Sequence, residues 1–220
     1  MEAAVFPLAD EIFITPMAAV AGSVADEILA AMLAGRKLDR AYVNNGGDSA
    51  LHLADSQSMK LAVAGTGNGF ADRIVIRAKD PVRGVATSGW RGRSFSLGIA
   101  DAVTVLAPTG AAADAAATII ANAVDLPGHK AVQRESARSL APDSDLGDRR
   151  VTTDVGALAP REVAEALESG LAAADVLRRR GLVEAAALFL NVEVRVCGEA
   201  LLDRQALSRV PLHQMTELTP

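Results

Sequence analysis

The chain has 220 residues, half of them apolar, with a formal net charge of -5 and only 3% aromatic residues. This length and apolar content predict one domain with a substantial core over residues 1–220. The acidic balance and the scarcity of aromatic rings argue against a nucleic-acid-binding surface, which needs a basic face. We therefore expect a small-molecule partner rather than a nucleic acid.

The cysteine content and the first residues of the chain indicate the cellular compartment of the protein. Cys197 is the only cysteine, which excludes an intramolecular disulfide and a cysteine-based zinc site. The start of the chain is acidic and lacks the basic patch and apolar run of a secretory signal. Residues 17–33 are apolar but contain Asp26 and Glu27, so they predict a buried helix and not a membrane span. We expect a cytoplasmic protein that does not interact with a membrane.

The first half of the chain alternates between helix and strand patterns. Thr15 is a typical N-cap residue, Pro16 is favoured at the first helical position, and Gly35 commonly ends a helix. A helix is therefore predicted over residues 16–34. Short strand-like segments follow at residues 40–44, 49–53, 59–64, 73–78, 84–88 and 102–107. Because the intervals are too short for crossover connections, antiparallel hairpins are expected. The alanine-rich residues 111–124 predict a second helix.

The second half is less regular. Residues 134–154 are polar and predict a long loop. A third helix is predicted to begin at Pro160 and to end near Arg180, with acidic residues first and basic residues last, as the helix dipole favours. Residues 185–196 change from continuous apolar to alternating and predict one strand. The pattern as a whole indicates an α+β fold with an antiparallel sheet packed against helices.

A turn that joins two predicted strands is the first candidate binding element. Its glycines supply the positive φ values of tight turns and also let a ligand approach the backbone. A plain turn and a ligand-binding turn therefore both stay open for Asn45, Gly46, Gly47 and Asp48. The glycine-rich residues 65–69 precede a strand and lack the context of a dinucleotide fingerprint, so they predict a plain loop.

A second candidate element follows the strand at residues 84–88. Hydroxyl groups, accessible backbone N–H groups and arginine guanidinium groups can all donate hydrogen bonds to a phosphate. This segment combines them in Thr87, Ser88, Gly89, Arg91, Arg93 and Ser94. The alternative is a surface loop whose arginines pair with the acidic residues 143–148.

The third candidate element is a row of oxygen donors on the second helix. Asp114 and Thr118 are four residues apart, hence on one face, and Asn122 extends the row. Such donors suit Mg²⁺. Alternatively, Asp114 complements the helix N-terminus and Thr118 bonds to the carbonyl of residue 114. These elements predict a site between Asn44 and Asn122 along the chain, with Asp114 and Thr118 as metal ligands.

Other polar residues predict no site of their own. His52, His129 and His213 are scattered without metal-ligand spacing, and no catalytic role is expected for them. Residues 143–148 resemble a calcium loop but lack the acidic residue and the glycine that an EF-hand requires.

Four segments, taken in order, resemble a known family. They are TPMAAVAG at residues 15–22, NNGGD at 44–48, ATSG at 86–89 and ADAAAT at 113–118. In this order they resemble the ApbE-like proteins, and most closely an uncharacterised bacterial and archaeal branch of that group. The resemblance covers residues 13–190 and implies a two-layer α+β T-fold. It also implies binding of FAD and Mg²⁺ and transfer of FMN to a threonine of a protein acceptor.

The resemblance assigns roles to particular residues. It implies that Asp114 and Thr118 hold the metal ion. It further implies that the flavin nucleotide, FAD or FMN, lies beside Gly46, Gly47, Thr87, Ser88 and Gly89.

The chain departs from the family pattern in two places. The transferases carry a His-x-x-Asp-Pro segment after Thr-Ser-Gly, whereas residues 91–101, RGRSFSLGIAD, contain no histidine. The region before Pro16 is short for the family, so a truncated N-terminal part is expected. Three hypotheses follow: a metal-assisted flavin or nucleotidyl transferase that attacks a pyrophosphate, a non-catalytic binding protein, and an oligomeric structural protein built through alanine-rich helices.

Overall fold

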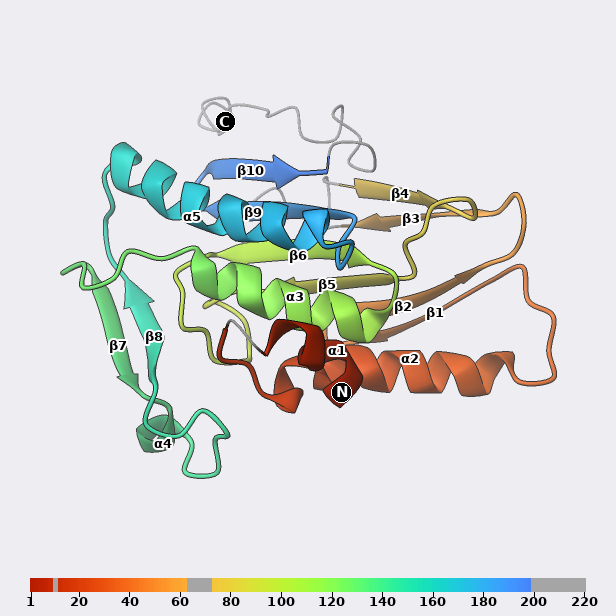
Figure 1. Cartoon of the computed structure of the whole chain (residues 1–220), viewed down its shortest axis with the longest axis horizontal. Helices are drawn as coiled ribbons and strands as arrows, with labels where there is room; N and C mark the ends of the chain where they lie inside the picture. The colour runs from red at the N-terminus through yellow and green to blue at the C-terminus, as the bar shows by residue number, and fades with distance from the viewer. Residues whose placement is uncertain (10–11, 63–72, 199–220) are drawn as a thin grey trace, which may run out of the picture.

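A six-stranded antiparallel sheet forms the centre of the computed structural model, which describes residues 1–9, 12–62 and 73–198 (Figure 1). Each strand in the order β1-β2-β5-β6-β9-β10 runs opposite to its neighbours. The strands are β1 (Arg40–Asn45), β2 (Asp48–Leu53), β5 (Gly84–Ser88), β6 (Ala102–Ala107), β9 (Ala185–Leu190) and β10 (Glu193–Cys197). The predicted strands at residues 40–44, 49–53, 84–88 and 102–107 are thereby confirmed.

Helices cover one face of this sheet (Figure 1). They are α2 (Val20–Leu33), which follows a 3₁₀ turn η2 (Pro16–Ala19), α3 (Gly110–Ala123) and α5 (Pro160–Arg179). The short elements α1 (Glu2–Val5) and η1 (Phe6–Leu8) precede them. All three predicted helices are confirmed, although the first begins as a 3₁₀ turn. The fold is α+β, with an antiparallel sheet packed against helices, as the sequence predicted.

A hairpin contributes to the apolar packing on the other face. It consists of β3 (Ser58–Ala62) and β4 (Arg73–Arg77). Ile74 and Ile76 are buried, and they belong to one apolar cluster with Leu51, Leu106 and Phe189 of the large sheet. The glycine-rich residues 65–69 and His213 lie outside the described residues, as do residues 63–64 of the predicted third strand.

Two predictions about the second half were wrong. Residues 134–154 do not form a long loop, because β7 (Val132–Ser136), α4 (Ala137–Leu140) and β8 (Arg150–Val155) occupy most of this segment. Along β7 exposed residues alternate with partly buried ones, but four of the five residues are polar or charged. The strand therefore lacks the apolar pattern by which a strand is recognised in a sequence. Residues 185–196 form two strands, since Asn191, with φ of 54°, turns the chain between β9 and β10.

The N-terminus of α3 is held tightly against α2. Oδ1 and Oδ2 of Asp26 accept hydrogen bonds from the backbone N–H groups of Gly110 and Ala111, both at 2.9 Å. A Cβ atom on Gly22 would lie 2.2 Å from the carbonyl oxygen of Gly110, so only glycine permits this approach of the two helices. This contact fixes the position of α3, and therefore of Asp114 and Thr118 on it.

Candidate functional site

A cavity of about 600 Å³ opens where α2, α3 and the carboxyl end of β5 meet. This volume lies within the range of small-molecule sites. The predicted residues that line it are Asn45, Gly46, Asp48, Thr87, Ser88, Gly89, Arg93, Ser94, Asp114 and Thr118. Thus three segments that are separate in the sequence come together around one space. The structure does not bring Gly47 or Arg91 to the lining.

Asp48, the first residue of β2, is the one charged residue that is buried among those the structure describes, with a relative exposure of 9%. Its Oδ1 accepts a hydrogen bond of 3.0 Å from the backbone N–H of Thr87 on β5. Burial raises the pKa of Asp48 to about 6, although the Thr87 hydrogen bond and the charge of Arg93 act in the opposite direction. The carboxyl group is therefore held in place at a site where its negative charge is poorly solvated.

Asp114 approaches the same cavity from α3. Its Oδ2 accepts a hydrogen bond of 2.9 Å from the backbone N–H of Gly22, so the side chain links α3 to α2. Burial and, to a smaller extent, the negative charge of Asp48 together raise the pKa of Asp114 to about 7, although hydrogen bonds from the backbone of Gly22 and Ala21 act in the opposite direction. The first alternative for Asp114, complementing its own helix terminus, does not hold, because Asp26 occupies that terminus.

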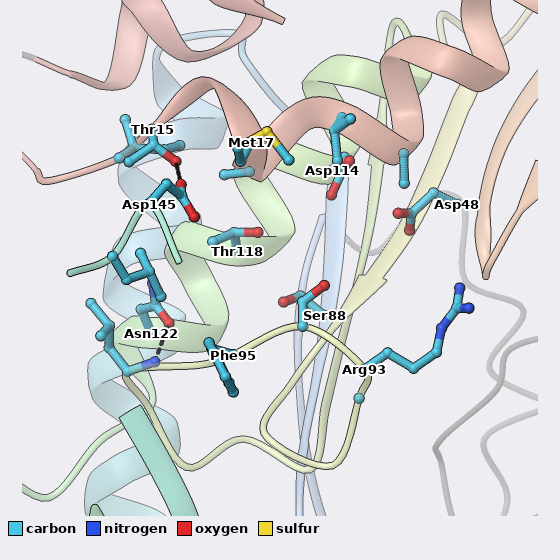
Figure 2. Close-up of a pocket in the computed structure, with 18 of the residues that line it drawn as sticks. Thr15, Met17, Asp48, Ser88, Arg93, Phe95, Asp114, Thr118, Asn122 and Asp145 are labelled. Carbon is cyan, nitrogen blue, oxygen red and sulfur yellow. Dashed lines mark hydrogen bonds between the residues drawn. The ribbon is translucent and has the colours of Figure 1, made fainter. Parts of the chain in front are cut away.

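The two carboxyl groups are side chains of the cavity that could hold a cation. Figure 2 shows Asp48, Asp114 and Thr118 directed into the same space. Among the described residues no group of three or more His, Cys, Asp or Glu side chains could hold a metal ion. Mg²⁺, however, commonly uses one or two carboxylates and completes its shell with water and phosphate oxygens. Two partly desolvated carboxyls with raised pKa values fit such an ion, because its charge would offset their repulsion.

Thr118 and Asn122 have different roles, although they lie on one face of α3. Within the described part of the chain the Thr118 hydroxyl makes no hydrogen bond to protein, so the bond back to the carbonyl of residue 114 is not formed. Oδ1 of Asn122 instead accepts hydrogen bonds from the N–H of Leu97 at 2.8 Å and the hydroxyl of Ser96 at 3.2 Å. Asn122 thus holds the loop after β5 in place, and its side-chain oxygen already accepts two hydrogen bonds from the protein.

The two glycines of the β1–β2 turn have positive φ values of 71° and 123°. A Cβ atom on Gly46 would lie 2.1 Å from Nη2 of Arg93, so the guanidinium group lies against this turn. Arg93 is exposed and makes no ion pair with the described residues, while its charge acts on Asp48. It is therefore a cation available to a ligand at the cavity.

Arg91 has a different environment from Arg93. Its Nε donates to Oδ1 of Asp101 at 2.6 Å, and its guanidinium carbon lies 4.5 Å from the ring centroid of Trp90. The expected role of Arg91 in phosphate binding is therefore not supported by its position. The alternative pairing with residues 143–148 is wrong for Arg91 as well, because its partner is Asp101.

Sequence reasoning missed two walls of the cavity. One wall is the segment before α2, including Phe13, Thr15 and Met17, and the other is the connection between α4 and β8 with Asp145 and Leu146. The Thr15 hydroxyl donates a hydrogen bond to Oδ2 of Asp145, which joins the two walls (Figure 2). The TPMAAVAG motif contained part of this information, whereas the resemblance of residues 143–148 to a calcium loop did not predict that residues 141–146 form a wall of the cavity.

The histidines of the described chain do not line the cavity. His52 Nε2 lies 3.0 Å from the carbonyl oxygen of Leu38, and His129 Nε2 lies 3.1 Å from Oε1 of Glu162 at the start of α5. Both have structural partners, and the loop between β5 and β6 contains no histidine.

Comparisons with known proteins place the chain in a family. A protein from Methanosarcina acetivorans named UPF0280 protein is 38% identical over 54% of this chain and 47% of its own length. UPF0280 proteins of Methanothrix thermoacetophila and Archaeoglobus fulgidus are 39% and 33% identical, over 50% and 60% of this chain and 46% and 53% of their own lengths. The chain spans about half the length of these curated relatives. A family model described as AbpE bacteria matches residues 1–199, and the chain therefore belongs to this family.

Proposed function

We propose that the cavity binds a phosphorylated ligand, of the flavin-nucleotide type, together with Mg²⁺. The observation that carries this proposal is the convergence of the buried Asp48 carboxyl and the partly buried Asp114 carboxyl with the Thr118 hydroxyl and the Arg93 cation, neither of which has a partner among the described residues. A metal ion and a phosphate group have complementary charges, and this cavity offers partners for both.

In this proposal Asp114 and Thr118 hold the metal ion, with Asp48 as a further oxygen donor or as a partner of its water shell. When bound, Mg²⁺ supplies Lewis-acid polarisation of phosphate oxygens. Arg93 lies against the Gly46 turn and offsets the phosphate charge, while Ser88, Ser94 and the backbone at Gly89 offer hydrogen-bond partners. Phe13, Met17 and Phe95 supply apolar surface for the ring of the ligand.

The order of the motifs supports an ApbE-like, T-fold-like protein as the setting for this site. The absence of histidine from the β5–β6 loop and from the described cavity lining favours ligand binding without FMN transfer. We therefore place the binding function first and the flavin or nucleotidyl transferase, with a protein acceptor, second. We assign both to the cytoplasm.

FAD titration with and without Mg²⁺ tests the binding function, with flavin fluorescence as the readout. We expect binding that requires Mg²⁺ and that weakens at least about tenfold in Asp114→Asn, since one carboxylate ligand is lost. Asp39→Asn, an exposed carboxylate outside the cavity, is the matched control and should bind as the wild type does. Binding that is independent of Mg²⁺ and unchanged in Asp114→Asn contradicts the metal assignment.

A separate measurement decides between binding and transfer. Incubation with FAD, Mg²⁺ and cell extract as the source of acceptors is followed for AMP release. We expect FAD to bind without release of AMP above the level of Asp114→Asn. Release of AMP by the wild type alone would reverse the order of the two functions.

A further inference from the structure

Helix α2 directs a row of large apolar side chains toward solvent. Val24, Ile28 and Met32 are 42%, 46% and 36% exposed. Spacings of four residues place these three side chains on one face of the helix. Of the segment Pro16–Leu33 only 22% is buried. An exposed apolar row of this extent is typical of an interaction surface.

The opposite side of α2 already has its partners. Ala25 and Leu29 pack in one cluster with Ala41 and Ala50 of β1 and β2, and Asp26 holds the start of α3. Figure 1 shows α2 beside α3 at the border of the helical layer. The apolar row is therefore a second face of the helix, in addition to the face that stabilises the fold.

Charged residues around the row make it complementary to itself. Glu27 flanks the row, and Arg36 and Lys37 follow the end of the helix; all three are exposed. Glu27 and Lys37 make no ion pair within the part of the chain that the structure describes. If two α2 helices pack antiparallel with their centre between Ile28 and Met32, Ile28 of each copy faces Met32 of the other. Glu27 of each copy then lies within about one helical turn of Arg36 of the other.

A membrane surface fits the same row less well. Pro16–Leu33 is long and apolar enough to span a membrane, with a mean hydropathy of 1.4. Helices that lie in a membrane interface, however, carry Lys and Arg on their polar face, whereas the charged residues within α2 are Asp26 and Glu27. The net charge of -5 also opposes attraction to anionic lipids.

We propose that the apolar face of α2 is a homodimer interface, in which α2 packs antiparallel against α2 of a second copy. Burial of the row removes its apolar side chains from water, and the pairs of Glu27 with Arg36 select the antiparallel direction. The cavity and the interface share one helix, because Val20 and Ala21 of α2 line the cavity.

Sedimentation velocity and light scattering of the full chain test this proposal. We expect a dimer for the wild type and a monomer for Ile28→Glu, because each copy would bury an unpaired charge. Val192→Glu replaces an apolar residue that is 71% exposed at the β9–β10 turn, and this matched control should remain a dimer. Asp114→Asn should also remain a dimer, which separates this proposal from the ligand-binding function.

Two further experiments, cysteine cross-linking and a charge exchange, keep the test decisive if Ile28→Glu fails to fold. Ala31→Cys lies on the exposed side of α2 and should give disulfide-linked dimers on oxidation, whereas Val192→Cys should not. Glu27→Arg should raise the dimer dissociation constant about tenfold, and adding Arg36→Glu should restore it. A wild-type monomer, a dimer unaffected by Ile28→Glu, or a monomer that binds anionic vesicles through α2 would overturn the proposal.

Discussion

Asp48 and Asp114 approach one cavity from different elements, and the negative charge of Asp48 raises the pKa of Asp114. Asp48 begins β2 and is held by the backbone of Thr87, whereas Asp114 lies on α3 and is held by the backbone of Gly22. Two carboxyl groups fixed in this way cannot move apart to relieve their repulsion. A bound cation would relieve it, and from this relationship the predictions below follow.

The stability of the metal-free protein should depend on pH through this pair. Folding raises both pKa values from about 3.8 to about 6 and about 7. Between the unfolded and folded values the native state holds protons that the unfolded state has released, so these groups make the free energy of unfolding fall as pH rises. We expect denaturation with urea and a chelator to give lower stability at pH 8 than at pH 5.

The double variant Asp48→Asn, Asp114→Asn is the control for this pH dependence. Neither amide titrates, so the decrease between acidic and neutral pH should become smaller than in the wild type. Mg²⁺ should restore stability to the wild type at pH 8 and should have no such effect on the double variant. An identical pH dependence in both proteins would show that the two carboxyls are not the source.

Arg93 and Arg91 should differ sharply when each is replaced by alanine. Arg93→Ala removes the cation beside Gly46, which has no ion-pair partner in the described ranges, and should weaken the binding of a phosphorylated ligand about tenfold. Arg91→Ala breaks the ion pair with Asp101, which should lower stability by up to about 1 kcal/mol and leave ligand affinity unchanged. Calorimetric titration with FAD in Mg²⁺ measures both affinities. Equal losses in the two variants would contradict the distinct roles.

Gly22 should be intolerant of even a methyl group. The Cβ of Gly22→Ala would meet the backbone of Gly110, which cannot move without displacing α3, so we expect a loss of about 1–3 kcal/mol in unfolding free energy. Ala30→Ser, exposed on the same helix, should change it by less than about 0.5 kcal/mol. Urea denaturation followed by circular dichroism measures both. A neutral Gly22→Ala would mean that α2 and α3 are not so closely packed.

The hydrogen bond between Thr15 and Asp145 should slow the release of a bound ligand. It joins two walls of the cavity, so Thr15→Val should raise the dissociation rate several-fold while the fold is retained. Asp143→Asn, in the same connection but outside the lining, is the control and should release ligand at the wild-type rate. Stopped-flow displacement of FAD, followed through the single tryptophan Trp90, gives both rates.

Much of the fold could be predicted because its elements carry local patterns. The alanine-rich α3 and the short strands between turn residues stand out by periodicity and by their glycines. The hairpin of β7 and β8 could not be predicted, because its few valines are interrupted by polar and charged residues, several of which, such as Arg134 and Thr153, are themselves partly buried. The turn at Asn191 was missed because a single asparagine within an apolar-to-alternating run is a weak indication.

The site was predictable in its residue types and less so in its geometry. The spacing of Asp114 and Thr118 and the motif order pointed to α3, and both residues line the cavity. Asp48 lies in the same cavity because β2 pairs with β5 and because α3 packs beside them. These tertiary contacts cannot be read from a local sequence pattern. Arg91 and Arg93 are only two residues apart, but their surroundings differ. Arg91 pairs with Asp101, whereas Arg93 makes no ion pair with the described residues.

The most direct test of the account is metal binding at the cavity itself, measured with Mn²⁺ in place of Mg²⁺ by electron paramagnetic resonance. With FAD present, we predict stoichiometric Mn²⁺ binding to the wild type, a large loss in Asp114→Asn and in Thr118→Val, and wild-type binding in Asp39→Asn. Mn²⁺ binding that is equal in all four proteins, or absent from the wild type with and without FAD, would contradict the central claim.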